Sequence, residues 1–227
     1  MSYKRAFAMV GAGATIFVLC AMAAISGAGG AQGGKAAEKV AAAEALPAAG
    51  TYVIDPVHTF AYFGARHHVV GLVRGRFDKV TGTVTVSKNP AECGVDVSID
   101  VSSINTQKGE RDEDLQSPAY FDVKKFPTMT YHGRGIRRGP GSNWTMDGEL
   151  SLHGVTKVVP LTFKFNGAFP DTKPGEPVRV AFHATAGVKR AEFGMGARDN
   201  LLELGASQAP DVEIQIDVEA DAKAATQ

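Results

Sequence analysis

The clearest signal in the chain is a strict alternation of apolar and polar residues. In GVDVSIDV, residues 94–101, every second position is apolar and most of the intervening positions are polar. DVEIQIDVEA, residues 211–220, repeats the pattern. Successive side chains of a β-strand point to opposite faces, so this period of two predicts strands with one buried face.

The same alternation, or a shorter apolar run of the same kind, recurs along most of the chain. Further strands are expected at residues 51–54, 58–66, 74–86, 128–137, 145–152, 159–167 and 178–186. Turn sequences such as HGVTK and PDTKPGEP separate some of these segments. The pattern favours an antiparallel sheet over βαβ units, and eight or more such strands close into a barrel or a sandwich.

One segment, residues 105–127, lacks the period of two. Thr106 is expected to cap a short helix that runs to about Leu115, where a Ser-Pro pair follows. Lys108 and Asp112 are four residues apart and would support each other weakly on that helix. The segment therefore predicts a long crossing loop that carries one helix over an end of the sheet.

The N-terminus has the pattern of a secretory signal. Lys4 and Arg5 precede an uncharged, mostly apolar run over residues 6–25, and small residues follow up to Ala31. This arrangement predicts a signal peptide, residues 1–31, that is cleaved after Ala31. The alternative is an uncleaved membrane anchor, because about twenty apolar residues are enough to span a bilayer.

The rest of the chain divides into a linker, one domain and a tail. Residues 32–49 are rich in alanine and poor in aromatic residues, which is typical of a linker. Residues 50–220 have the length of a single domain, and residues 221–227 form a short tail. The expected location is the periplasm or another exported compartment, with membrane anchoring through the N-terminal segment as the alternative.

Charge and cysteine content narrow the possible partners and cross-links. The chain has 24 basic and 24 acidic residues, and no basic stripe alternates with aromatic residues. We therefore expect no nucleic-acid partner. Cys93 is the one cysteine after the signal segment, so no intrachain disulfide can form there, and we expect a lone thiol at the surface or rim.

Histidines are frequent near the start of the domain, which raises the question of a metal site. His67 and His68 are adjacent, so on a strand they point to opposite faces and cannot reach one metal. His132 and His183 are out of phase with their apolar neighbours and are expected to face solvent. Zinc needs three or four converging ligands, so no metal site is expected.

The sequence resembles a known family over nearly all of residues 52–220. The resemblance rests on five stretches, YVIDPVHTFAYFGARH, VRGRFDKVTGTVTV, INTQKGERDEDLQSPAYFDVKKFP, GELSLHGVTKVVPLTF and RAEFGM. These stretches are similar to those of the YceI-like family. The resemblance implies a lipocalin-like antiparallel β-barrel of about eight strands that holds a polyisoprenoid or similar lipid in the bacterial periplasm. One departure is Asp114, where the family often has histidine, which suggests a different preferred head group.

Aromatic and aliphatic residues on the expected strands are candidates for the wall of a lipid-binding interior. A barrel of about eight strands has an interior that side chains just fill or that holds one small ligand. The candidates are Phe60, Tyr62, Phe63, Phe77, Phe121, Phe126, Tyr131, Leu150, Leu152, Phe163, Phe165, Phe182 and Phe193. For any single one of them, ordinary core packing is the alternative.

A polar rim is expected where the second strand and the crossing helix meet the mouth of the barrel. Its candidate residues are His67, His68, Arg111 and Asp112. For Arg111 and Asp112 the alternative is a structural ion pair that anchors the helix. His58 is expected to be structural, with its ring hydrogen-bonded near Asp55.

These observations predict an exported binding protein without catalytic residues and without a cofactor other than a bound isoprenoid or fatty-acid-type lipid. One alternative is an enzyme that acts on such a lipid, with His67 and a carboxylate as acid and base. Another is an interaction module with a solid core. The sequence gives no expectation for the oligomeric state.

Overall fold

The structure is a computed structural model that describes residues 46–67, 71–169, 176–195 and 212–223. The expected signal segment, most of the linker and His68 lie outside these ranges. Among the described helices, none is both long and apolar enough to cross a bilayer.

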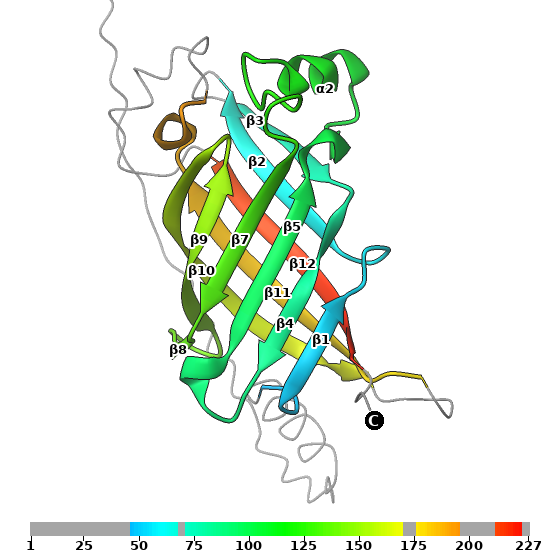
Figure 1. Ribbon diagram of the computed structural model, residues 1–227, viewed down its shortest axis with the longest axis vertical. Coiled ribbons are helices and arrows are strands. Elements are labelled where there is room, and N and C mark those ends of the chain that lie inside the picture. Colours follow the sequence, from blue (N-terminus) through cyan, green and yellow to red (C-terminus); the bar gives the residue numbers. More distant parts are fainter. Residues whose placement is uncertain (1–45, 68–70, 170–175, 196–211, 224–227) are drawn as a thin grey trace, which may run out of the picture.

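The described chain is a succession of strands with one short α-helix between β6 and β7 (Figure 1). The strands are β1 (Gly50–Ile54), β2 (Phe60–His67), β3 (Gly71–Phe77), β4 (Val80–Val86), β5 (Gly94–Asp100), β6 (Ile104–Asn105), β7 (Thr128–Arg134), β8 (Arg137–Arg138), β9 (Trp144–Leu152), β10 (Val155–Phe169), β11 (Arg179–Val188) and β12 (Val212–Ala222). The helices are α2 (Gly109–Gln116) and the 3-10 turns η1 (Pro90–Glu92), η2 (Val101–Ser103) and η3 (Arg190–Phe193).

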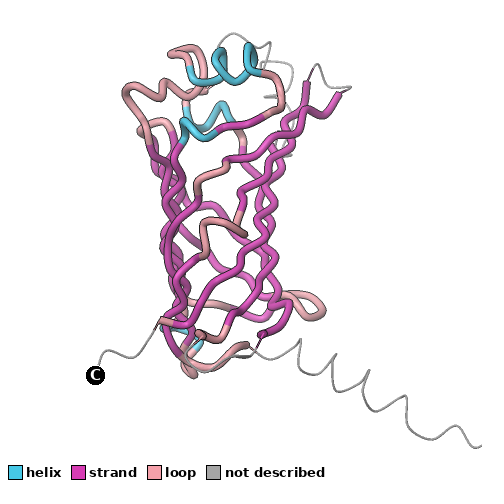
Figure 2. Tube along the Cα trace, turned by 90° about the vertical axis from the view of Figure 1, so that its right-hand side faces the viewer, coloured by secondary structure: helices cyan, strands magenta, loops and turns pink. Residues whose placement is uncertain are grey.

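The strands form one closed antiparallel barrel. Their order is β1-β4-β5-β7-β9-β10-β11-β12-β2-β3-β6, and an additional pairing of β1 with β12 closes the ring. β1 pairs with the C-terminal part of β12 and β2 with its N-terminal part, so these two strands share one position in the wall. β3 and β4 share a second position and β5 and β6 a third, which gives eight positions. Figure 2 shows the strands of this barrel from the side. The expected eight-stranded all-β barrel with one short helix is confirmed.

Each of the three shared positions consists of two consecutive strands with a short interruption between them. The three interruptions lie at neighbouring places in the wall. The breaks lie at residues 55–59, 78–79 and 101–103. At the second break the backbone N–H of Asp78 donates to the Ser103 carbonyl over 3.1 Å, and that of Lys79 to the Ser103 hydroxyl over 3.1 Å. The sequence predicts one strand over residues 74–86. The structure instead has two strands, β3 and β4, separated by Asp78 and Lys79.

The helix begins later than the sequence predicts. Lys108 is the N-cap of α2 and makes no side-chain capping bond, and Thr106 lies before the helix. Lys108 pairs with Glu110 at 2.8 Å, and Asp112 turns back to Thr106. The expected Thr106 cap and the expected pairing of Lys108 with Asp112 were therefore wrong, because Asp112 is already engaged by the buried threonine.

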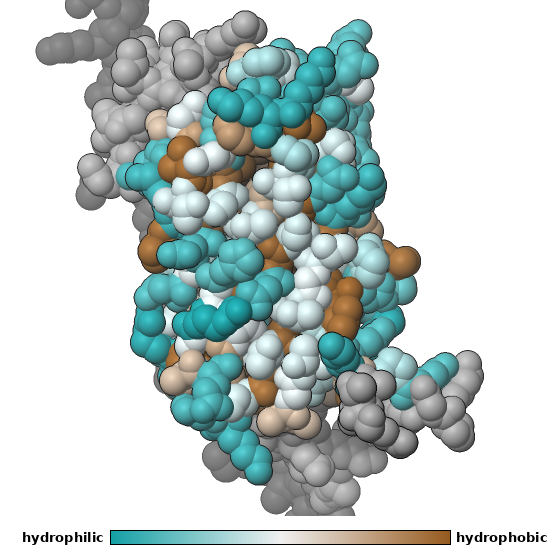
Figure 3. Space-filling model, in the orientation of Figure 1, coloured by the Kyte–Doolittle hydropathy of each residue, from teal (hydrophilic) through white to brown (hydrophobic). Residues whose placement is uncertain are grey.

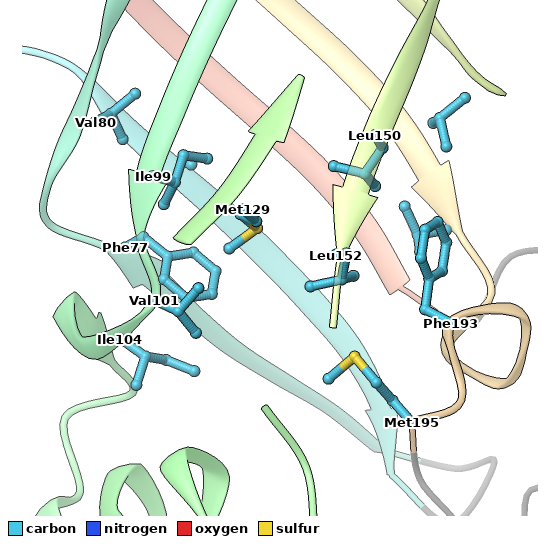
Figure 4. Close-up of a cluster of buried hydrophobic side chains, with 13 residues drawn as sticks. Phe77, Val80, Ile99, Val101, Ile104, Met129, Leu150, Leu152, Phe193 and Met195 are labelled. Atoms are coloured by element: carbon cyan, nitrogen blue, oxygen red, sulfur yellow. The ribbon is translucent and has the colours of Figure 1, made fainter. Parts of the chain in front are cut away.

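The inner face of the barrel carries the apolar phase of each strand. In β9 the buried positions include Met146, Gly148, Leu150 and Leu152, with the alternate positions more exposed. One buried cluster lies toward the α2 end and includes Phe77, Met129, Leu152 and Phe193 (Figure 4). Two other clusters, built around Phe182 and Trp144, lie toward the opposite end.

Candidate functional site

An apolar cavity of about 190 Å³ lies inside the barrel. Inward-facing side chains of most strands line it. They include Phe63 of β2, Phe77 of β3, Ile99 of β5, Leu150 of β9 and Ile216 of β12. The period of two that predicted the strands thus also places these apolar side chains around one interior space.

A second, smaller cavity of about 70 Å³, here called the lower compartment, continues the interior away from α2. Five residues line both spaces and form a ring that we call the waist: Val84, Val95, Leu161, Ala184 and Val218. Beyond the lower compartment, the cluster of Cys93, Ile136, Trp144 and Met146 closes the barrel. On the scale of a 150 Å³ cavity that holds benzene, the two spaces together have room for roughly ten carbon atoms.

The cavity reaches the α2 end of the barrel. Five residues from the crossing segment and from the turn after β11 line it there and define the mouth: Leu115, Tyr120, Phe121, Arg190 and Met195. Figure 1 places α2 and η3 at this same end, and Figure 3 shows apolar side chains at the surface just below it. Of the described residues around the cavity, Arg190 is the only charged one.

Tyr131 lies in the cavity wall and is held by two contacts. Its hydroxyl donates to the Val159 carbonyl over 3.0 Å. Its ring lies across Gly148, where a Cβ atom would be 2.3 Å from the Tyr131 Cζ. Burial, with a smaller contribution from the charge of Asp147, raises the Tyr131 pKa to about 12, so the phenol stays protonated at neutral pH.

Nine of the predicted wall residues border the interior; Tyr62, which stands on the outer face of its strand, is described below. Around the main cavity lie Phe63, Phe77, Phe121, Tyr131, Leu150 and Leu152, and around the lower compartment lie Phe163 and Phe182. Their contact with a ligand stays a prediction.

Phe60 and Tyr62 lie on the outer face of β2. The guanidinium carbon of Arg76 lies 4.5 Å from the centre of the Phe60 ring, and the Tyr62 residue is 36% exposed, although Tyr62 also borders the cavity. Ala61 and Phe63 take the inward positions. Bulky residues stand in both phases of this strand, so the sequence did not show which phase faces inward.

Three more candidates pack in the protein instead of lining either space. The Phe126 ring lies against His153, with ring centres 4.8 Å apart. Phe165 and Phe193 are buried in the apolar clusters, 7% and 1% exposed. For Phe165 and Phe193 the alternative of ordinary core packing describes the structure, whereas Phe126 is half-buried and lies outside the apolar clusters of the described residues.

Arg111 and Asp112 converge on one buried threonine. The Arg111 Nε donates to the Thr106 hydroxyl over 2.8 Å, and its Nη2 to the Thr106 carbonyl over 2.8 Å. Asp112 accepts from the Thr106 backbone N–H over 2.9 Å and from its hydroxyl over 2.5 Å. Neither side chain borders the cavity, so both anchor α2 to the end of β6. The side chain of His67 and all of His68 lie outside the described part of the chain.

A group of charged residues joins β1, β11 and β12 on the outer wall. His58 Nδ1 lies 2.7 Å from an Asp55 carboxylate oxygen, which confirms the expected hydrogen bond. Ligand atoms of Asp55, His58 and Glu219 lie within 4.8 Å of one another, a spacing that would suit a metal ion. However, the Arg179 guanidinium contacts Asp55 at 2.9 Å and Glu219 at 3.0 Å and already supplies their positive charge.

The same group shifts the acidity of Asp55. The hydrogen bond with His58 is the main cause that lowers the Asp55 pKa, burial opposes it, and the backbone N–H of Val57 and the charge of Arg179 lower it further. This carboxylate is therefore ionised in the folded protein at neutral pH.

Two further histidines lie on the outer wall, and the cysteine is buried. His132 pairs with Asp96 at 2.9 Å and His183 with Asp217 at 2.7 Å, and both face outward, as expected. Cys93 was expected at the surface or rim but is only 3% exposed and borders the lower compartment. Its buried neighbours are Ile136, before β8, and Trp144 and Met146 of β9, which lie far along the chain and are not apparent from the local sequence.

Comparisons with known proteins agree with the fold. A family model described as the YceI-like domain matches residues 52–220. Protein YceI of Salmonella newport (strain SL254) is 34% identical over 175 residues, which cover 75% of this chain and 86% of that protein. A UPF0312 protein of Yersinia pestis (strain Pestoides F) is 33% identical over 150 residues, which cover 65% of this chain and 77% of that protein.

Solved structures share the architecture. The Campylobacter jejuni YCEI protein is 27% identical, with a TM-score of 0.58 over 70% of this chain and 90% of that one. A polyisoprenoid binding domain from Saccharophagus degradans is 18% identical, with a TM-score of 0.54 over 76% of this chain and 98% of that one, which shows a common fold. The matched family model and the identity to the curated relatives lead to one conclusion: this chain belongs to the YceI-like family.

Proposed function

We propose that this chain is an exported protein that binds the hydrocarbon chain of a polyisoprenoid, or of another long-chain lipid, inside its barrel. The observation that carries the proposal is the apolar cavity of about 190 Å³, continued by the lower compartment, inside a closed wall. The likeness to a protein described as a polyisoprenoid binding domain supports the same class of ligand.

Transfer energies indicate how much the interior contributes. Roughly ten buried carbons would give about 8 kcal/mol of gross transfer free energy, at about 0.8 kcal/mol for each. The loss of ligand freedom on binding costs about 4 kcal/mol or more. The chain contacts therefore give modest affinity alone, and tight binding requires further contacts at the mouth.

The composition of the lining favours binding over catalysis. Among the described residues around the two spaces, the titratable side chains are those of three tyrosines, Arg190 and Cys93, with no carboxylate or histidine. General acid–base chemistry needs a positioned pair of proton donor and acceptor near the reacting atoms. The two interior spaces also argue against a core packed solid.

The direct test is native mass spectrometry of the protein purified from its own host, with the extracted lipids identified. We expect an added mass that denaturation releases as an isoprenoid or other long-chain lipid. Protein that carries no lipid, and that also fails to bind farnesol after delipidation, would contradict the proposal.

A matched pair of variants tests the location of the ligand. Ala186 of β11 borders the cavity, whereas the neighbouring Thr185 is in the outward phase of the same strand. Ala186→Phe fills the interior and should reduce farnesol binding about tenfold or more, whereas Thr185→Phe adds the same ring outside and should not. Equal binding by both variants would show that the ligand lies elsewhere.

Export is a separate part of the proposal. The charged and apolar N-terminal pattern leads us to propose that residues 1–31 direct export and are then removed. N-terminal sequencing of the exported protein should find Gln32 or a close neighbour. Protein that retains Met1 in the membrane fraction would instead support an uncleaved anchor.

A further inference from the structure

We propose that Arg190 binds an anionic head group, a phosphate or a carboxylate, at the mouth of the cavity. The inference rests on the proposed function, because it assigns the polar end of a ligand whose chain lies in the barrel. It also moves the expected head-group contact from Arg111 to a different arginine.

The first observation is the position of Arg190. It is the only charged residue among the described residues that border the main cavity, and it is partly buried. At the same end the cavity is bordered by Leu115, Tyr120 and Phe121 of the crossing segment. At the other end, the lower compartment has no charged residue among its described lining. A lipid is therefore oriented with its polar end at the mouth and its chain toward the waist.

The second observation is how firmly the backbone holds Arg190. It is the first residue of η3, a short turn that ends at Phe193, which is 1% exposed. Gly194 takes a left-handed conformation with φ of 68°, and the Met195 N–H donates to the Arg190 carbonyl over 3.1 Å. His153 Nδ1 lies 3.1 Å from the Phe193 carbonyl oxygen and ties the turn to the β9–β10 connection. The turn thus fixes the place from which the arginine side chain extends.

The chemistry of the arginine side chain suits an anionic head group. A guanidinium group stays charged at physiological pH and presents a planar fork that matches a phosphate or carboxylate. An anionic head group at the mouth can bind this fork while its chain fills the cavity. The inference does not require Arg190 to lack other partners, since a head group can join an existing polar network.

Arg111 provides the matched control. Two of its nitrogens donate to Thr106, and it does not border the cavity. Its expected role is to hold α2. Loss of Arg111 should therefore alter the affinity for all ligands alike, through the position of the helix, and not for anionic ligands in particular.

The experiment is a binding titration with farnesyl phosphate, farnesoic acid and farnesol, which share one isoprenoid chain. For Arg190→Gln we expect the affinity for the two anions to fall about 10- to 100-fold and that for farnesol to fall less than about twofold. Arg190→Lys should restore part of the loss, and Arg111→Gln should not separate anions from the alcohol. Comparison of the affinities for farnesyl phosphate and farnesoic acid shows which anion the site prefers.

The outcomes separate this inference from the proposed function. Equal losses for all three ligands, or no loss, would overturn the role of Arg190 while leaving chain binding intact. If the unaltered protein binds none of the three, the proposed function fails first. If Arg190→Gln does not fold, the salt dependence of ligand binding to the unaltered protein tests the inference. Its affinity for farnesyl phosphate should fall with added salt while that for farnesol does not, and equal salt dependence would overturn the inference.

Discussion

At the scale of single residues, the packing of the interior depends on a glycine as well as on large side chains. The Tyr131 ring occupies the space that a side chain at Gly148 would need, and this places its hydroxyl within reach of the Val159 carbonyl. Alternation along β9 marks Gly148 as an inward position, but it does not show which ring covers it. That information comes from the register of β7 against β9, in which Tyr131 pairs with Leu150.

Gly148→Ala should therefore destabilise the protein. The added Cβ would lie 2.3 Å from the Tyr131 Cζ, so the ring must move and its hydrogen bond must weaken. We expect a loss of about 1–3 kcal/mol in the free energy of unfolding, measured by urea denaturation. Gly109→Ala is the control, because a Cβ there meets nothing within 4 Å. Equal stability of the two variants would show that the wall can adjust around Tyr131.

At the scale of elements, α2 is held to the barrel by side chains more than by its own sequence. It has no side-chain cap and no buried residue. Thr106, at the end of β6, is 5% exposed and is the shared partner of Arg111 and Asp112. The position of the helix over the mouth thus depends on one threonine outside it.

Thr106→Val should loosen α2 while leaving the barrel folded. Valine keeps the shape but removes the hydroxyl that bonds to Arg111 and Asp112. Hydrogen exchange over residues 109–116 should become faster, and overall stability should fall by about 1–3 kcal/mol. Thr81→Val, at an exposed position of β4, serves as the control. Unchanged exchange in α2 would mean that other contacts hold the helix.

The extent to which the sequence predicts the structure also differs between elements. β5 and β12 were predictable because one phase is apolar throughout, and burial selects that phase. β2 was ambiguous because Phe60 and Phe63 stand in opposite phases. The break between β3 and β4 depends on Ser103, which lies far along the chain. Arg190 was missed as a mouth residue because a short turn gives no periodic signal, although it lies in the RAEFGM stretch.

At the scale of the whole molecule, the barrel is closed by a short pairing and a group of charges. Only Tyr52, Val53 and Ile54 of β1 pair with β12. Next to this seam, Arg179 of β11 contacts Asp55, Glu219 and Asp221 at 2.8–3.0 Å. Closure therefore combines backbone pairing with a network that depends on ionised carboxylates.

The network predicts how stability depends on pH. The folded pKa of Asp55 lies below its ordinary value. Its stabilising effect is therefore fully present above the unfolded pKa of about 3.9 and is lost as the pH falls through the folded pKa. Asp55→Asn should cost about 1–3 kcal/mol near pH 7 and should flatten the decline of stability in acid, measured by thermal unfolding from about pH 7 to pH 2.

Asp114→Asn, at an exposed position of α2, is the control for this measurement. It should leave both the stability and its pH profile close to those of the unaltered protein. An Asp55→Asn profile as steep in acid as that of the unaltered protein would assign the acid sensitivity to other groups.

The waist has a consequence for the rate at which a ligand leaves. Because the wall is closed and the far end is filled, a chain bound as proposed must withdraw lengthwise through the mouth, one carbon after another. If the transition state for exit has lost the contacts of the innermost carbons, each further buried methylene lengthens the residence time about fourfold. The gain should stop once the lower compartment is full, at roughly ten carbons, so dissociation rates should fall from prenol to geraniol and level off from geraniol to farnesol. Ala184→Phe, which narrows the waist, should bring the levelling to a shorter chain. The barrel would then sort lipids by how long it retains them.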